Sequence, residues 1–355
     1  MFVRSFAAVL GALLLVFGCA RGFAETFLIT SDLHLTEDSA AHEAALEALR
    51  SASEGADAVI LLGDSVNNAR PEEHARVTAF LASLDAPCYV IPGNHDVTTD
   101  ISAFTELYAD FGWNDAFSRD GGSASCAVIT AGGACLLLLD TNDVTGGVAP
   151  LGGISEATCA WVSETLAALP EGTPVIACGH HPLLPAERQA RTPGAQALVA
   201  ALQGVKLYLC GHDHGFATVR ARGLQQITTG QPHAYPGWAG LLEVDPDGFH
   251  WRVVPLYDDE TQQAMRAETL TLADSMARGT LKGTPFEDDE EAIRWFTEAF
   301  DAAMSSRLDE ETCRAMLDRP AAQKWRMVET KTVVKSWILG LLEGCPQDVR
   351  QIDIE

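Results

Sequence analysis

Five short stretches of the sequence gather side chains that bind metals or carry protons. These stretches, which hold six of the ten histidines, are Asp32-x-His34, Gly63-Asp64, Gly93-Asn94-His95-Asp96, Gly179-His180-His181-Pro182 and Gly211-His212-Asp213-His214. Neutral imidazoles, carboxylates and an amide oxygen suit borderline or hard divalent ions such as Mn, Fe or Zn. Two such ions ~3.5–4 Å apart can hold a phosphoryl oxygen, generate hydroxide near neutral pH and stabilise an in-line displacement. One carboxylate shared by both ions would fix their separation.

Each polar stretch ends an apolar segment whose composition predicts a buried strand. These segments are 26–34, 56–64, 87–96, 174–182 and 205–214, and apolar residues at helical spacing occupy 40–52 and 72–84. Such a β-α-β-α-β order predicts a parallel sheet covered on both faces. Ligands of open α/β sheets bind beyond the carboxyl ends of the strands. We therefore expect the polar tips to meet at one edge.

The remainder of the chain divides near Tyr257. Before it, 125–142 predicts a hairpin, 155–168 predicts a helix, and the three segments from Leu224 to Leu256 predict a meander of short antiparallel strands. After it, helical periodicity occurs at 260–278, 287–304 and 320–343. The expected organisation is a leader over 1–24, a domain over 25–257 and a helical C-terminal extension over 258–355. The extension's tryptophans, at helical spacing with other apolar residues, are expected in its core.

The formal net charge of −25 argues against nucleic acid or an anionic membrane as the main partner, since both require a basic face. A phosphorylated substrate would have to be attracted by something local, such as bound cations. The oligomeric state has no signature in the sequence.

Residues 1–24 have the layout of a secretory signal peptide. Arg4 precedes an apolar run that ends at Phe17, and small residues follow as far as Ala24. The run is shorter than the roughly 20 residues that span a bilayer. The stretch VFGC also resembles the lipobox of bacterial lipoproteins, with Val16 where leucine is preferred, and in that case Cys19 would carry a lipid anchor. We expect export, either secretion or attachment to the extracytoplasmic face of a bacterial membrane.

Eight of the nine cysteines lie beyond Cys19. Those within predicted strands, namely Cys88, Cys135, Cys178 and Cys210, are expected to be buried small hydrophobes rather than disulfide partners. Cys313 and Cys345 are the pair to expect if any disulfide forms.

The five stretches, in this order over 26–256, resemble the motif set of the calcineurin-like metallophosphoesterases. A single motif is weak evidence, whereas five in order after predicted strands are strong. The resemblance implies a four-layer α/β/β/α sandwich of two mixed sheets with a two-metal centre between them. It assigns Asp32, His34 and His214 to the first metal, Asn94, His180 and His212 to the second, and Asp64 as the bridge. His180 is chosen because related tips place the ligand two residues before the proline, and His181 is the alternative.

The resemblance also gives roles to the residues that follow Asn94. His95 would lie over the substrate, stabilising the phosphorane charge or protonating the leaving oxygen. Asp96 would orient His95. The His-His-Pro tip and the segment 228–245 are similar to the class III cyclic-nucleotide phosphodiesterases and glycerophosphodiesterases of the family.

The expected activity is hydrolysis of phosphoesters, with phosphodiesters preferred, by attack of a metal-bridging hydroxide. A phosphomonoesterase or nucleotidase is the alternative within enzymes, and a catalytically silent metal-binding scaffold is the alternative outside them. A lone histidine is more often structural than functional, so His42 and His74, within predicted helices, are expected at the helix surface. His233 could line a pocket, although a loop or packing role is favoured.

Overall fold

The apolar segments before the polar tips form parallel strands in two sheets. The computed structural model describes residues 24–36, 39–97, 101–142, 150–184, 192–330, 334–344 and 348–355. The first sheet has the order β13-β12-β11-β1-β2-β3, with bounds Gln351–Ile354, Gly248–Pro255, Trp238–Asp245, Glu25–Thr30, Ala58–Leu61 and Cys88–Val90. The second has the order β4-β5-β6-β7-β8-β10-β9, with bounds Ser118–Arg119, Cys126–Ile129, Cys135–Leu139, Val175–Gly179, Leu207–Cys210, Leu224–Thr228 and Ala217–Ala221.

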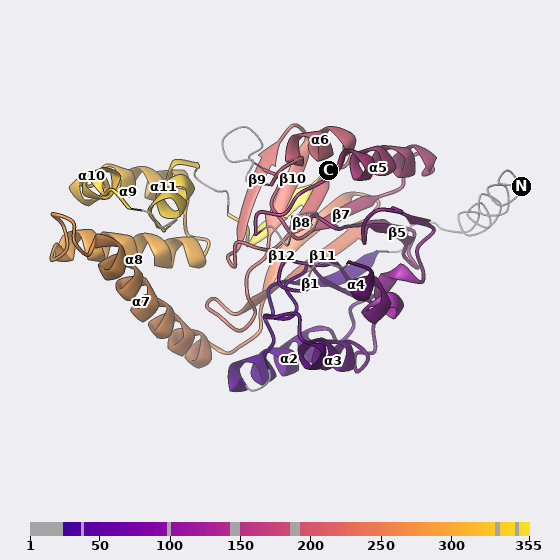
Figure 1. The fold of residues 1–355 in the computed structure, drawn as a ribbon, viewed down its shortest axis with the longest axis horizontal. Helices are drawn as coiled ribbons and strands as arrows, with labels where there is room; N and C mark the ends of the chain where they lie inside the picture. The colour runs from indigo at the N-terminus through magenta and orange to yellow at the C-terminus, as the bar shows by residue number, and fades with distance from the viewer. Residues whose placement is uncertain are drawn as a thin grey trace, which may run out of the picture.

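The two sheets pack face to face, and helices cover their outer faces (Figure 1). Helices α2 (Ala40–Ala52) and α3 (Pro71–Leu81) lie on the first sheet, and α5 (Glu156–Ala168) and α6 (Ala195–Ala201) lie on the second. The short α4 (Ile101–Leu107) and the π-helix η1 (Ala109–Trp113) follow β3. The layers are therefore α/β/β/α, as the family resemblance implied.

Side-chain alternation along the strands explains why both faces of each sheet are covered. Phe27 and Ile29 of β1 enter the core between the sheets, whereas Leu28 between them packs under α2 and α3. In β6, Leu136 enters the core between the sheets and Leu137 packs under α5 and α6. Because successive side chains of a strand point to opposite faces, a continuous apolar run needs cover on both.

The register of the parallel strands brings the polar tips together. Thr30 at the end of β1 pairs with Leu61 at the end of β2, and Leu61 pairs with Val90 at the end of β3. The strands β1, β2 and β3 therefore end at the same level of the sheet. In the second sheet β6, β7, β8 and β10 are parallel in the same way. The prediction that the tips of the first three strands meet at one edge is confirmed.

The prediction for the strands after residue 223 was only partly right. β11 and β12 form the expected antiparallel hairpin, but β10 belongs to the other sheet, where it pairs parallel with β8 and antiparallel with β9. A sequence pattern shows that a segment is extended, and not which sheet it joins. The cysteines expected in strands lie there and are buried.

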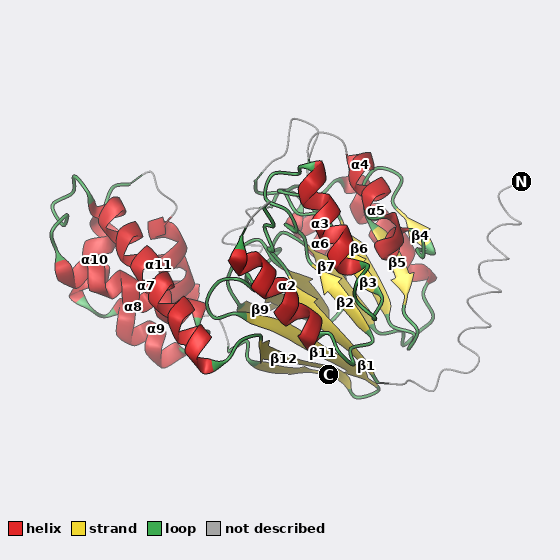
Figure 2. Ribbon diagram, turned by 90° about the horizontal axis from the view of Figure 1, so that it is seen from below, coloured by secondary structure: helices red, strands yellow, loops and turns green. Residues whose placement is uncertain are grey.

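The C-terminal extension is a separate cluster of helices beside the sandwich (Figure 2). Its helices are α7 (Asp259–Leu281), α8 (Glu290–Met304), α9 (Glu310–Leu317), α10 (Pro320–Met327) and α11 (Val334–Gly344). Trp295 and Trp325 are fully buried in its core, and Trp337 packs against it. Among the described residues, no helix is both long and apolar enough to cross a bilayer.

The expectation that the extension is helical to its end was wrong. Gln351–Ile354 forms β13, which pairs antiparallel with β12 at the edge of the first sheet. The Trp251 indole nitrogen donates to the carbonyl of Val349 at 2.8 Å, which fixes the returning chain. The helices α7–α11, called the helical unit below, are therefore joined to the sandwich at both ends. Residues 1–23 of the expected leader, which include Cys19, lie outside the described residues, as does Cys345.

Candidate metal centre

The loops after β1, β2 and β3 are joined by hydrogen bonds that their main-chain amides donate. The amide of Asp32 donates to the carbonyl of Gly63 at 3.0 Å, and the amide of His34 donates to the carbonyl of Asp64 at 2.9 Å. The amide of His95 donates to Asp64 Oδ1 at 2.7 Å. These bonds hold the three tips as one surface.

The first group of potential ligands is Asp32, His34, Asp64 and His214, whose ligand atoms lie within 4.8 Å of one another. His34 Nε2 is 3.1 Å from His214 Nε2 and 3.7 Å from Asp64 Oδ2. His214 Nε2 is 3.6 Å from Asp32 Oδ1. These are the residues that the sequence analysis assigned to the first metal, together with the expected bridge.

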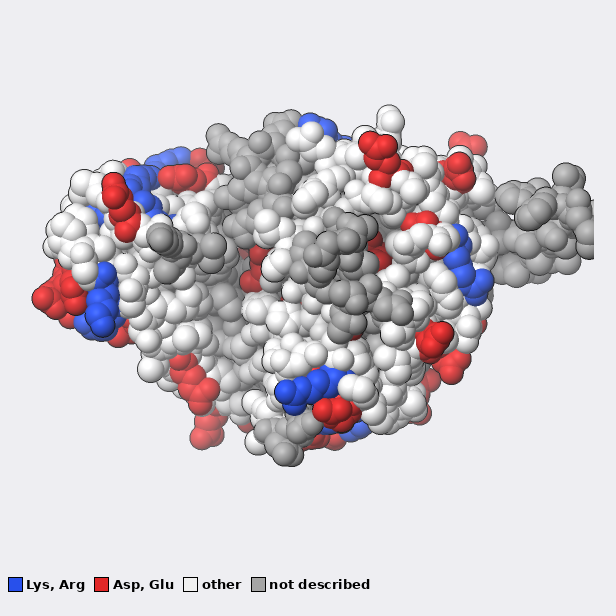
Figure 3. Space-filling view, viewed as in Figure 1, with Lys and Arg blue, Asp and Glu red and all other residues white. Residues whose placement is uncertain are grey.

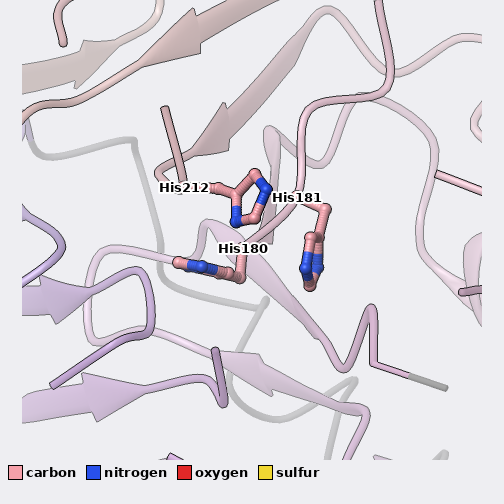
Figure 4. Close-up of side chains that lie close together, drawn as sticks. All are labelled: His180, His181 and His212. Carbon is pink, nitrogen blue, oxygen red and sulfur yellow. The ribbon is translucent and has the colours of Figure 1, made fainter. Parts of the chain in front are cut away.

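The second group comes from the second sheet and comprises His180, His181 and His212 (Figure 4). His180 and His181 follow β7, and His212 follows β8. His212 Nδ1 is 3.1 Å from the side-chain oxygen of Asn94, and His180 Nε2 is 3.2 Å from Asp64 Oδ2. Asp64 therefore lies between the two groups.

The donor atoms of both groups fit divalent cations. His180 Nδ1 donates to the carbonyl of Leu62 at 2.8 Å, so Nε2 presents its lone pair towards the carboxylate of Asp64. This Nε2 and that of His181 are buried and have no hydrogen-bond partner. The lone pair of His180 Nε2 and the carboxylate of Asp64 are both acceptors, and two buried acceptors that face each other need a positive charge between them.

The pKa values of the buried ligands also indicate that this site binds positive charge. Burial opposes a charge on His180, but the Asp64 carboxylate outweighs burial and raises the pKa of His180 to about 9. Burial raises the pKa of Asp32 to about 7, although His180 opposes the rise. Burial also lowers the pKa of His34 to about 3. Metal cations would replace the protons that Asp32 and His180 otherwise hold, whereas the imidazole of His34 is already neutral and can bind a cation.

His95 and Asp96 do not form the expected pair. Asp96 is 3% exposed, and its carboxylate accepts from the amides of Gly93 at 2.8 Å and Val66 at 3.0 Å. His95 Nδ1 instead donates to the carbonyl of Asn67 at 2.8 Å. The role given to Asp96 is therefore corrected: it orders the loop, and a main-chain carbonyl orients His95, whose ring lies 4.7 Å from that of His34.

Three further histidines are at least partly buried. His42, expected at a helix surface, is 8% exposed, and its Nδ1 is 3.4 Å from the amide nitrogen of Thr36. Its ring meets that of His233 edge to face at 4.6 Å, and His233 Nδ1 is buried without a hydrogen-bond partner. His74 is also buried, at 4% exposure, because its Nδ1 contacts the Tyr108 hydroxyl at 2.8 Å. Helical periodicity did not predict the burial of His42 and His74, because it does not show which loops pack over a helix.

Comparisons with known proteins agree with this geometry. Residues 25–216 match the model of the calcineurin-like phosphoesterases. The chain belongs to that family. It is therefore a hydrolase of phosphoesters that uses divalent metals, and the cyclic-nucleotide and glycerophosphodiester branch is the one that the sequence indicated.

Three relatives illustrate the range of the family. The 3',5'-cyclic adenosine monophosphate phosphodiesterase CpdA of Escherichia coli K12 is 27% identical over 228 residues, which cover 58% of this chain and 77% of CpdA. The glycerophosphodiester phosphodiesterase GpdQ of Enterobacter lignolyticus is 30% identical over 177 residues, covering 47% and 59% of the two chains. The tartrate-resistant acid phosphatase type 5 of Rattus norvegicus is 26% identical over 227 residues, covering 57% and 65%.

Gly93 tests how closely the tips must approach. A Cβ at this position would lie 2.2 Å from both the amide nitrogen and the Oδ1 atom of Asp64. We expect Gly93→Ala to displace Asp64 and lower metal affinity by about ten-fold or more, measured by titration of metal-free protein. Gly121→Ala, which meets no atom within 4 Å, is the control. Unchanged affinity in Gly93→Ala would show that Asp64 does not need this approach.

Metal stoichiometry can show which of the two residues, His180 or His181, binds the metal. Because His180 Nε2 lies 3.2 Å from Oδ2 of Asp64, the carboxylate between the two ligand groups, we expect His180 to be the ligand. Elemental analysis should find fewer metal equivalents in His180→Ala than in His181→Ala, with the latter close to wild type. The reverse order would make His181 the ligand.

Proposed function

We propose that the protein is an exported phosphodiesterase with a dinuclear metal centre. The single observation that carries the proposal is the position of Asp64, whose Oδ2 atom is 3.7 Å from His34 Nε2 in one ligand group and 3.2 Å from His180 Nε2 in the other. One carboxylate can then serve both cations. Export is proposed on the signal-peptide layout of the first 24 residues.

The donor types favour Mn, Fe or Zn over Mg, because half of the ligands proposed for each cation are imidazoles. Asp32, His34, Asp64 and His214 would hold the first cation, and Asp64, Asn94, His180 and His212 would hold the second. When bound, the two cations would supply Lewis-acid charge and a hydroxide for attack on phosphorus.

The chain's own residues would position the substrate and handle its charge. His95 is fixed through Nδ1 by the carbonyl of Asn67, so Nε2 is the nitrogen that can serve the phosphate. From there it would donate a hydrogen bond to a phosphoryl oxygen or a proton to the leaving oxygen. On the face shown in Figure 3, Lys and Arg side chains occur singly or beside acidic ones, not as a continuous patch. Since the formal net charge of the whole chain is −25, attraction of the phosphate would come from the metal centre itself.

Phosphodiesters are proposed as substrates because CpdA and GpdQ are both phosphodiesterases by name. A phosphomonoesterase is the second candidate, and the similarity to an acid phosphatase is the observation that favours it.

The substrate class is tested with protein loaded with Mn²⁺, Fe²⁺ or Zn²⁺. We expect a higher kcat/KM for bis(p-nitrophenyl) phosphate than for p-nitrophenyl phosphate, with loss of both activities after metal removal by a chelator. Preference for the monoester would support the second candidate. No hydrolysis of either ester by protein that carries two metal equivalents would overturn both.

The role of His95 is tested by His95→Ala. Loss of its imidazole should lower kcat about 10²–10⁴-fold, since it acts on charge that develops in the transition state. Metal content should stay at the wild-type level. His250→Ala removes a histidine on β12 that contacts Asp353 and serves as the control. Loss of a metal equivalent in His95→Ala would move His95 into the ligand set.

A further inference from the structure

The helical unit contacts the sandwich at two loops, one of which carries proposed ligands of the metal centre. One is the loop between β8 and β9, residues 211–216, which carries His212 and His214. The other is the loop between β10 and β11, residues 229–237, which carries His233. Figure 1 shows the helices on the side of the sandwich where these strands lie.

The contact with the first loop is made by the turn after α8. Ser306 is 9% exposed, and its hydroxyl donates to the carbonyl of Phe216 at 3.2 Å. The sulfur of Met304 is the nearest side-chain atom that a Cβ at Gly215 would meet, at 3.7 Å. The helical unit therefore touches the two residues that follow His214.

This turn is braced within the helical unit. Asp301, near the end of α8, is 6% exposed and accepts from Arg266 Nε of α7 at 2.8 Å. Its second oxygen accepts from the guanidinium of Arg307, on the far side of the turn. Because the carboxylate of Asp301 binds Arg307 as well as Arg266, it fixes the turn from Asp301 to Arg307, in which Ser306 lies.

The contact with the second loop is made by Tyr235. Its side chain packs against the core of the helical unit, although Tyr235 belongs to the sandwich. Within the same loop, Thr229 donates its amide to the carbonyl of Cys210 at 2.8 Å, and a Cβ at Gly230 would lie 2.9 Å from the carbonyl oxygen of His214. Tyr235 therefore anchors a loop that itself lies against the loop of His214.

The loop of His214 needs such support because its backbone is strained. His212 and His214 have φ values of 73° and 57°, in the left-handed region that residues other than glycine rarely adopt. Such conformations are unfavourable and persist only where the surroundings hold them. On the inner side the amide of His212 donates to both carboxylate oxygens of Asp32, at 3.2 and 3.1 Å. Further along the loop, the support comes from Ser306 and Met304 of the helical unit.

We propose that the helical unit positions the loop of His214 and thereby sets the metal affinity of the group formed by Asp32, His34, Asp64 and His214. Ser306 and Tyr235 are the positioning residues, and the inference rests on the metal centre of the proposed function. His214 depends on this support more than the other members of its group, because its side chain is 46% exposed and those of Asp32, His34 and Asp64 are at most 10% exposed.

The test is a Co²⁺ titration of metal-free full-length protein, followed by visible absorption. Ser306→Gly removes the hydroxyl and, at φ 50°, adds no strain. We expect Ser306→Gly and Tyr235→Ala each to weaken one of two Co²⁺ equivalents about ten-fold while the other keeps its wild-type affinity. Glu310→Gln removes an exposed partner of Arg314 in the same helical unit and should change neither equivalent.

Thermal unfolding separates positioning from general destabilisation. Metal-free Ser306→Gly should unfold at the wild-type Tm and gain less Tm from Co²⁺, because stabilisation by a ligand falls with its affinity. Should Tyr235→Ala unfold early, Ser306→Gly alone decides. Wild-type affinity of both equivalents in Ser306→Gly, or equal weakening of both, would overturn the inference while leaving the proposed function intact. Wild-type protein that binds no Co²⁺ would instead overturn the metal centre itself.

Discussion

The carboxylate of Asp64 lies between imidazoles of two sheets, and the rest of the site is arranged around it. Asp64 is 1% exposed, and burial alone would raise its pKa. The charge of His180 and the amide of His95 outweigh burial and keep the pKa below its usual range. An ionised carboxylate in a buried place is stable only with compensating charge. The sheets therefore have to deliver several nitrogens to one point, and the loops that carry them have little freedom.

That restriction is visible in the backbone. Among the described residues, eight other than glycine have positive φ, and five of them are proposed ligands: Asp32, His34, Asp64, His212 and His214. Strain of this kind persists where tertiary contacts outweigh local preference, as occurs at functional sites. The parallel strands supply those contacts, since β1, β2 and β3 end at one level and their tips share main-chain hydrogen bonds. Fold stability and site geometry are thus linked through the same loops.

The sequence predicted the parts of this arrangement that follow from strand order. Parallel strands with polar tips lead to one edge, so the proximity of Asp32, Asp64 and Asn94 needed no structure. The partner of His95 could not be predicted in this way, because a main-chain carbonyl such as that of Asn67 leaves no mark in the residue types. The burial of His42 and His74 depends on the loops and helices packed over them, and β13 is a strand only because β12 offers it an edge. Each of these depends on long-range contacts that periodicity does not encode.

The edge of β12 also explains why an appended helical cluster can act on a loop. A unit joined by one linker would be free to turn, and a single hydrogen bond such as that from Ser306 to Phe216 would not hold it. Here β13 closes a second connection through its pairing with β12, and Lys206 at the start of the β8 segment donates to the main-chain oxygen of Glu355 at 2.9 Å. Two connections make the approach of the helices to the loops largely intramolecular, so weak contacts there act at high effective concentration.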